Sequence, residues 1–164
     1  MTQSSPLNLM ILMPVRDDWA SASELLRRLD QVISPNDCTV DILMVDDASS
    51  IRCAPVDFQA FTVLGGIRVL RLRRNLGHQR AIAIGLAYLQ EQGRYDAVLV
   101  MDADGEDTPK GVLDLMSAFK ENGGASAIFC AAARRVFGSC EWMSWISGSR
   151  SRRANTTSGS TLEV

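Results

Sequence analysis

The part of this sequence best suited to bind a metal ion is a set of three acidic residues at alternate positions, Asp102, Asp104 and Glu106. They follow a short apolar run, and in extended chain Asp102 and Asp104, on either side of Ala103, would point the same way. Their carboxylate oxygens suit hard cations such as Mg²⁺ or Mn²⁺. A cation held there would keep open positions for diphosphate oxygens and would neutralise a leaving nucleotide. The alternative, that these are solvated loop or helix-capping acids, stays open.

A second acidic pair, Asp46-Asp47, also follows an apolar run and could contact a nucleotide. One carboxylate could accept hydrogen bonds from a base or ribose while the other holds the loop. An Asx turn that closes the strand explains the pair equally well. Asp18 ends the polar run that starts at Arg16, and it could contact a base or ribose or simply lead into the first helix.

Basic residues around Asn75 and Gly77 form a third polar cluster. The planar fork of an arginine binds two phosphate oxygens at once. A glycine near the start of a helix lets backbone amides approach an anion. A solvated basic turn explains the cluster equally well. His78 is the only histidine, which excludes a two-histidine zinc site, and a surface position on the helix is its simplest interpretation. The basic residues are Arg71, Arg73, Arg74 and Arg80.

The apolar pattern predicts the elements that must position these residues. Amphipathic segments predict helices: Ser21 and Glu24 form a capping box before the first, residues 77–92 form the second, and Thr108 with Pro109 begins the third. Strands that are apolar throughout and separated by helices indicate an α/β fold, a mostly parallel sheet with helices on both faces. The apolar runs that suit buried strands are residues 7–13, 40–45, 67–72, 97–101 and 125–130.

Four consecutive predicted strands end in polar residues. Ligands of parallel sheets bind beyond the carboxyl ends of the strands, so these polar residues are expected at one edge.

The hydrophobic fraction of 46% is ordinary for a soluble globular protein. A net charge of −2 gives no reason to expect a nucleic-acid partner. No apolar run approaches the roughly 18 residues that would suggest a transmembrane segment.

Together these motifs resemble family 2 glycosyltransferases, most closely the dolichyl- and polyprenyl-phosphate sugar synthases. The resemblance covers about residues 7–130. It implies a GT-A fold, in which this sheet is the nucleotide-binding, Rossmann-like half. It also implies a hexosyltransferase that uses Mg²⁺ or Mn²⁺ to transfer a sugar from UDP or GDP with inversion. A lipid-phosphate acceptor would place it, as a peripheral protein, at the cytoplasmic face of a membrane. The matching segments are Pro14-Val15-Arg16-Asp17-Asp18, Val45-Asp46-Asp47-Ala48-Ser49, Arg74-Asn75-Leu76-Gly77 and Met101-Asp102-Ala103-Asp104.

The same resemblance assigns contacts to the donor nucleotide. Pro14, Arg16 and Asp18 fall on the family's nucleotide-contacting P-x-Y-N-E motif. Arg16 replaces its tyrosine, which removes an aromatic ring for stacking on the base, and Asp17 replaces its asparagine. Asp47 falls on the acid that reads the base.

A metal site follows from the resemblance in the same way. Asp102 and Asp104, with Ala103 between them, fall on the D-x-D motif that binds the metal and the diphosphate. Glu106 falls where the polyprenyl-phosphate members often carry a glutamine that joins the metal. The loop at Asn75 and Gly77 is expected to contact the donor as well.

The chain departs from the family pattern after about residue 133. Residues 147–160 are rich in Ser, Arg, Thr and Gly, with little to bury. We therefore expect residues 1–133 to form the nucleotide-sugar-binding domain and residues 134–164 an irregular, disordered tail. The family's catalytic base and acceptor region lie well downstream of the D-x-D, and we identify no candidate base here. This pattern suggests a truncated or frame-shifted chain that binds donor but transfers sugar poorly.

Two other functions stay open. A non-catalytic fragment would bind a nucleoside diphosphate without turnover. A phosphohydrolase of the haloacid dehalogenase type would use Asp102 as nucleophile and Asp104 as acid and base, because residues 98–105 resemble its motif. That motif normally lies on an early strand with a lysine and more acids downstream, whereas only Lys110 and Lys120 follow here. A dehydrogenase is excluded because no G-x-G-x-x-G follows the first strand.

Overall fold

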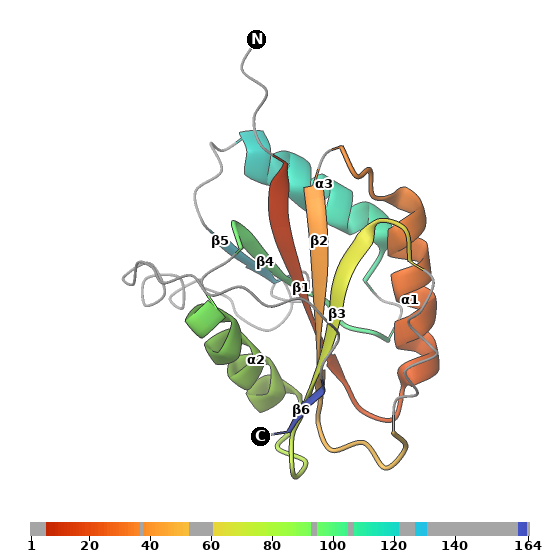
Figure 1. Cartoon of the computed structure of the whole chain (residues 1–164), viewed down its shortest axis with the longest axis vertical. Helices are drawn as coiled ribbons and strands as arrows, with labels where there is room; N and C mark the ends of the chain where they lie inside the picture. The colour runs from red at the N-terminus through yellow and green to blue at the C-terminus, as the bar shows by residue number, and fades with distance from the viewer. Residues whose placement is uncertain are drawn as a thin grey trace.

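The computed structural model describes residues 6–36, 38–52, 61–92, 95–104, 107–121, 127–130 and 161–163, the last two ranges as backbone only. Strands and helices alternate along most of this chain (Figure 1). The elements are β1 (Leu7–Val15), α1 (Trp19–Val32), β2 (Cys38–Asp46), β3 (Leu64–Arg71), α2 (His78–Gln92), β4 (Ala97–Val100), α3 (Pro109–Glu121), β5 (Ala127–Cys130) and β6 (Thr161–Glu163).

The described strands form one sheet in the order β5-β4-β1-β2-β3-β6, and every pairing between them is parallel. β1 lies inside the sheet, paired with β2 along its whole length and with β4 on its other side. From Leu9 onward every residue of β1 is buried, as expected for a strand covered on both faces. The prediction of an α/β fold with a parallel sheet is therefore confirmed.

Alternating side chains of the strands form two apolar cores, one on each face of the sheet. On β1, Leu9, Ile11 and Met13 belong to the core with α1 and α3, whereas Met10 and Leu12 belong to the core with α2. Figure 1 shows α2 on one side of the sheet and α1 and α3 on the other. Helices therefore cover both faces, as the sequence predicts.

β3 begins earlier than predicted, because it includes Gly65 and Gly66. The side chain of Asp41 on β2 occupies the space where larger residues would project: its Oδ1 accepts a hydrogen bond from the Gly66 amide at 2.8 Å. A Cβ atom on Gly65 would lie 2.5 Å from the same oxygen. The β2–β3 ladder is irregular at this point, so the glycines accommodate a bulge inside the strand.

β1 also continues through Pro14 to Val15, beyond the predicted end at residue 13. The last hydrogen bond toward β4 is donated by the Met101 amide to the Leu12 carbonyl at 3.0 Å. Pro14 lies two residues after Leu12, and its backbone nitrogen faces the same side of β1, at a level where β4 has already ended. Its missing N–H therefore costs no ladder hydrogen bond, which is how a proline fits in this strand.

The predicted capping box at Ser21 and Glu24 is wrong. α1 begins at Trp19 with Asp18 as its N-cap, so Ser21 lies inside the helix. Glu24 instead accepts hydrogen bonds from Arg27 at 2.7 Å and Arg28 at 2.9 Å. These two guanidinium groups, Arg27 first, lower the pKa of the Glu24 carboxyl to about 2. The helix begins before Ser21, so that residue cannot be the N-cap, and Glu24 pairs instead with arginines one turn along the helix.

Asp30 joins α1 to the start of β3. Its carboxylate accepts hydrogen bonds from the amides of Thr62, Val63 and Leu64, the one from Val63 at 2.7 Å. Partial burial is the largest single influence and raises the pKa of Asp30, but these hydrogen bonds together hold that pKa below its ordinary value. The helix thereby orients the chain that enters β3.

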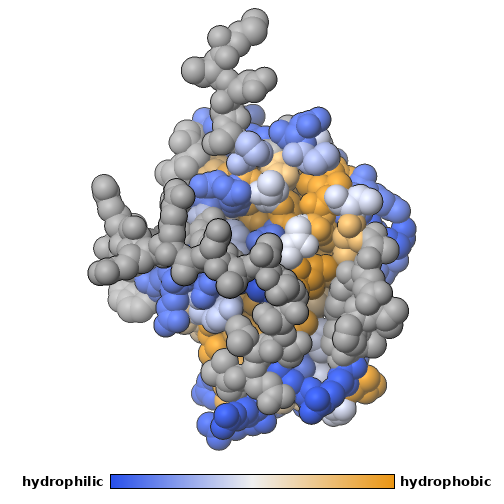
Figure 2. Space-filling model, in the orientation of Figure 1, coloured by the Kyte–Doolittle hydropathy of each residue, from blue (hydrophilic) through white to orange (hydrophobic). Residues whose placement is uncertain are grey.

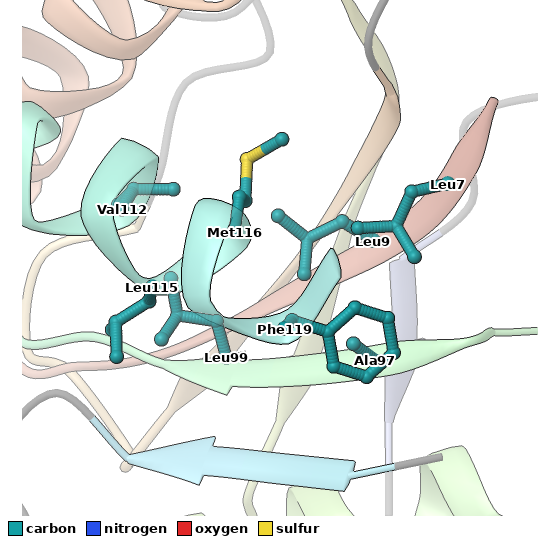
Figure 3. A pocket seen from close by; sticks show the side chains of 8 residues that line it. All are labelled: Leu7, Leu9, Ala97, Leu99, Val112, Leu115, Met116 and Phe119. Carbon is teal, nitrogen blue, oxygen red and sulfur yellow. The ribbon is translucent and has the colours of Figure 1, made fainter. Parts of the chain in front are cut away.

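α3 begins as predicted, with Pro109 as its first residue. The Thr108 hydroxyl accepts a hydrogen bond from the Gly111 amide at 3.3 Å, which caps the helix. Beneath α3 is an apolar pocket (Figure 3), toward the amino ends of β1 and β4 and away from the predicted polar cluster. It offers no polar group to a ligand, so we treat it as a packing gap. Its lining residues are Leu7, Leu9, Ala97, Leu99, Val112, Leu115, Met116 and Phe119.

Thr161–Glu163 forms β6, although residues 134–164 were expected to be irregular; it pairs in parallel with the end of β3. The rest of that segment lies outside the described residues, as does Glu106. The proposed domain boundary at residue 133 stays a prediction. None of the helices in the described part of the chain is long and apolar enough to span a membrane.

Candidate functional site at the carboxyl edge of the sheet

The loops that follow β1, β2, β3 and β4 lie together at one end of the sheet, which we call the carboxyl edge. The register brings Val15 beside Asp46 and Asp46 beside Arg71, so the first three strands end level with one another. In Figure 2 hydrophilic residues gather at the lower end of the molecule, where Figure 1 shows β1–β3 ending. The predicted meeting of polar residues at one edge is therefore observed.

Asp17 ties the loop after β1 to the loop after β2. Its amide donates to the Ser49 hydroxyl at 2.9 Å, and its Oδ1 accepts from the amides of Ser50 at 2.6 Å and Ile51 at 3.1 Å. The Trp19 indole adds a hydrogen bond to the Ile51 carbonyl at 2.8 Å. Asp17 adopts a positive φ of 57°, an unusual conformation that these contacts maintain. Asp17 therefore has a structural role that its motif did not indicate.

Asp46 is the member of the acidic pair that orders its own loop. It is only 2% exposed, and its Oδ1 accepts a hydrogen bond from the Ser49 amide at 2.7 Å. The Arg71 Nε lies 3.6 Å from its Oδ2, and Arg71 also donates to the Ser49 carbonyl at 3.1 Å. Arg71 is thus engaged in holding this loop, unlike the exposed arginines that follow it.

Asp47 connects the loop after β2 to the loop after β3. It is 4% exposed, and its two oxygens accept hydrogen bonds from the amides of Leu76 at 2.7 Å and Gly77 at 2.9 Å. This pair of contacts spans about thirty positions of sequence, and no local pattern signals it. The contact of Asp47 with a donor base or ribose stays a prediction.

Gly77 links the loop after β3 to the start of α2. Its φ of +89° lies in the region that favours glycine, and its carbonyl accepts from the amides of Arg80 and Ala81, both at 3.0 Å. Its own amide donates to Asn75 Oδ1 at 2.9 Å as well as to Asp47. In this structure the amide therefore serves the loop, and its predicted approach to an anion stays a prediction.

His78 is an exposed helix residue, as predicted, and it also lies beside the predicted metal motif. Its Nε2 is 3.4 Å from Asp102 Oδ1, with the side chains 47% and 23% exposed respectively. Asp107 Oδ2 accepts a hydrogen bond from the Asp102 amide at 2.8 Å and so orders the turn after β4. The position of His78 directly after Gly77, at the first residue of a helix on the carboxyl edge, is the signal that could have placed it in the site.

The acidic motif itself is less extended than predicted. β4 ends at Val100, and Ala103 and Asp104 lie in a turn. Asp102 is half-buried, Ala103 is 7% exposed and Asp104 is exposed. In the described residues no three acidic, histidine or cysteine side chains come close enough to bind a metal together, and Glu106 is not among those residues.

The other residues predicted to contact the donor nucleotide lie partly in the core and partly on the surface. Pro14 is buried within β1, whereas Arg16 and Asp18 are exposed at the carboxyl edge. Asp18 caps α1 through its backbone carbonyl, which accepts from the Ala22 amide at 3.2 Å, and its carboxylate makes no capping hydrogen bond. Asn75 is exposed at the same edge, as are Arg73, Arg74 and Arg80.

The chemistry of this edge combines two kinds of charged group. Asp18, Asp102 and Asp104 supply carboxylate oxygens, which suit a hard cation. Exposed guanidinium groups follow β1 and β3, and these suit phosphate. A ligand that carries phosphate groups and binds together with a divalent cation would complement both.

Comparisons with known proteins match the chain to glycosyltransferases. The chain is 27% identical over 125 residues to an uncharacterised glycosyltransferase of Bacillus subtilis, covering 76% of this chain and 37% of that protein. It is 34% identical over 110 residues to the undecaprenyl-phosphate 4-deoxy-4-formamido-L-arabinose transferase of Pseudomonas paraeruginosa, covering 65% of this chain and 31% of that protein. The chain thus spans about a third of the length of these curated relatives. The model of glycosyl transferase family 2 matches residues 10–161, and on that match the chain belongs to this family.

Proposed function

We propose that this chain forms the donor-binding part of a glycosyltransferase that takes its sugar from UDP or GDP with the help of a divalent cation. The observation that carries the proposal is the position of Asp102 and Asp104 at the carboxyl edge. The half-buried Asp102 faces His78, and the exposed Asp104 lies two residues later, in the turn after β4. Membership of the family supports the reaction class.

Asp102 and Asp104 would hold the cation, with Glu106 as a proposed third ligand. Mg²⁺ is typically bound by one or two protein carboxylates together with substrate phosphates, so this donor set fits Mg²⁺ or Mn²⁺. When bound, the cation would neutralise charge that develops on the leaving diphosphate. The exposed Arg16 and Asp18 would contact the nucleotide, and the loop at Asn75 would border the diphosphate.

The proposed acceptor is a polyprenyl phosphate. Support comes from relatives named as undecaprenyl-phosphate sugar transferases. A phosphate oxygen of the acceptor would attack the anomeric carbon opposite the departing nucleoside diphosphate, which inverts that carbon. The acceptor oxygen is already ionised, so the step does not require a protein base. Because such an acceptor resides in lipid, we propose that the protein acts peripherally at the cytoplasmic membrane surface.

Two competing functions make different predictions. A chain that binds donor without transferring it is a serious alternative, since this chain covers about a third of its curated relatives. A phosphohydrolase has less support, because the family match is to glycosyltransferases and both described lysines, Lys110 and Lys120, are exposed on α3. Radiolabelled sugar transfer to polyprenyl phosphate, and hydrolysis of p-nitrophenyl phosphate with Mg²⁺, separate the three.

Thermal unfolding with UDP, GDP and their sugars tests the donor site directly. A nucleotide at about one hundred times its Kd should stabilise the protein by about 2.7 kcal/mol, but only with Mn²⁺ or Mg²⁺ present. For a chain of this size that corresponds to a rise in Tm of about 5–10 °C. Asp104→Asn should remove the metal-dependent rise, whereas Asp114→Asn, an exposed acid on α3, should retain it. An unchanged rise in Asp104→Asn would remove Asp104 from the metal site.

A further inference from the structure

His78 is held at the carboxyl edge by the start of α2. The Gly77 carbonyl accepts hydrogen bonds from the Arg80 and Ala81 amides, both at 3.0 Å, so the first helical turn is closed around the histidine. Ala81 is fully buried in the core beneath α2, which fixes this turn against the sheet. The imidazole is therefore carried by an ordered helix end, with 47% of the side chain exposed.

The atom that lies opposite the imidazole is Asp102 Oδ1, at 3.4 Å from His78 Nε2. Asp102 is also held by its backbone neighbours. The Met101 amide donates to the Leu12 carbonyl at 3.0 Å, and the Asp102 amide donates to Asp107 Oδ2 at 2.8 Å. An imidazole nitrogen and a carboxylate oxygen, both common metal ligands, are thus brought together by two ordered elements.

The distance between these two atoms matches that between two ligands of one cation. An ordinary N–H···O hydrogen bond spans about 2.7–3.2 Å, less than the 3.4 Å found here. A tetrahedral ion bound by His and Asp at about 2.0–2.2 Å places neighbouring ligand atoms about 3.3–3.5 Å apart. The octahedral oxygen ligands of Mg²⁺ lie only about 2.8–3.0 Å apart. The separation therefore suits a transition-metal ion better than Mg²⁺.

We propose that His78 Nε2 is a ligand of the divalent cation at the donor site, together with Asp102 Oδ1, and that it makes the site prefer Mn²⁺ or Co²⁺ to Mg²⁺. The inference rests on the proposed function, in which Asp102 and Asp104 bind that cation. Carboxylate oxygens alone suit Mg²⁺, whereas an imidazole nitrogen favours transition-metal ions. Oxygens of Asp104 and of the donor diphosphate would complete the coordination.

Two other roles for His78 would involve no contact with a metal. A protonated imidazole would pair with Asp102 as a cation, and a neutral one would donate a hydrogen bond to the same carboxylate. His78→Lys retains the positive charge and His78→Gln retains a hydrogen-bond donor, but neither supplies an imidazole nitrogen. These two variants therefore separate a metal ligand from a partner of Asp102. Gln79→Ala alters the next exposed residue of α2 and is the matched control.

Calorimetry with saturating UDP measures the affinities for Mn²⁺, Co²⁺ and Mg²⁺. Loss of a residue that only orients a metal ligand typically costs about 10–100-fold in affinity, so loss of the ligand itself should cost at least about ten-fold. His78→Gln should weaken Mn²⁺ and Co²⁺ binding by that factor and change Mg²⁺ binding less than about two-fold. His78→Lys should weaken all three, because it places a positive charge beside the cation. Gln79→Ala should bind all three ions like the wild type.

Pulsed electron paramagnetic resonance of bound Mn²⁺ detects the ligand directly. His78 is the only histidine of the chain, so in protein without a histidine tag an imidazole-nitrogen coupling can come from no other residue. The wild type with UDP should show this coupling, and His78→Gln should lose it. Absence of the coupling in the Mn²⁺-loaded wild type, or wild-type Mn²⁺ affinity in His78→Lys, would overturn the proposal and leave His78 as a partner of Asp102 alone. A wild type that binds no divalent cation would instead contradict the proposed function, and this inference with it.

Discussion

Replacing Gly85 with alanine would test how closely α2 packs on the sheet. Gly85 lies on the buried side of α2, against β1 and β2. An added Cβ would overlap Leu12 Cδ1 and lie 2.8 Å from Val45 Cγ2. Both neighbours are fully buried in the core beneath α2, so neither has free space into which it can move.

Two opposing effects set the size of the change in stability. Overpacking a filled core costs about 1–3 kcal/mol. Alanine recovers about 0.5–1 kcal/mol because it loses less entropy than glycine in a helix. We therefore expect Gly85→Ala to lower the free energy of unfolding by about 1–2 kcal/mol, which is a fall in Tm of roughly 2–8 °C.

Gly111→Ala provides the comparison within the same protein. The added Cβ makes no tight contact, so the only effect should be the better helix propensity of alanine. This should raise the free energy of unfolding by about 0.5–1 kcal/mol. Urea unfolding at 25 °C, with equal m-values for the three proteins, measures both differences. If Gly85→Ala proved as stable as Gly111→Ala, α2 would not pack on the sheet as closely as described.

Further predictions concern single side chains. Asp30→Asn should lower the free energy of unfolding by about 1 kcal/mol at neutral pH, discounted for its exposure. Folding lowers the pKa of Asp30 from 3.8, so the stability difference between Asp30→Asn and the wild type should reach its full size above pH 3.8. It should disappear as the pH falls through the lowered pKa. A difference that persisted in acid would contradict this assignment. NMR titration should place the pKa of Glu24 near 2 and return it toward 4.5 in Arg27→Gln; an unchanged value would assign the shift elsewhere. Cys38 is buried and should resist alkylation until the protein unfolds, as peptide mapping by mass spectrometry would show; rapid labelling of the native protein would refute its burial.

The α/β framework could be predicted because its signals are local. Buried strands and amphipathic helices leave periodic patterns, and these located every helix and strand described up to β5. The ends of elements were harder, since Pro14 and Gly65 are usually read as breaks. Here the neighbouring strands remove the penalty: β4 has ended beside Pro14, and Asp41 fills the space beside Gly65.

The site could be predicted as a place more readily than as a set of contacts. Parallel strands bring the ends of β1–β4 to one edge, so the sequence predicts which residues gather there. It does not indicate that Asp47 binds Leu76 and Gly77, or that His78 lies beside Asp102, because those pairs are distant in sequence. Such contacts depend on how the loops cross in three dimensions.

The hydrogen bonds that join the loops after β1 and β2 have a consequence for engineering. Asp17 and Trp19 bind the Ser49 hydroxyl and the backbone of Ser50 and Ile51 in the loop after β2, so each loop supports the other. Grafting only one of them from a relative would leave the other loop without its supports. A loop exchange that keeps the protein folded should therefore replace residues 16–19 and 46–51 together, as one unit.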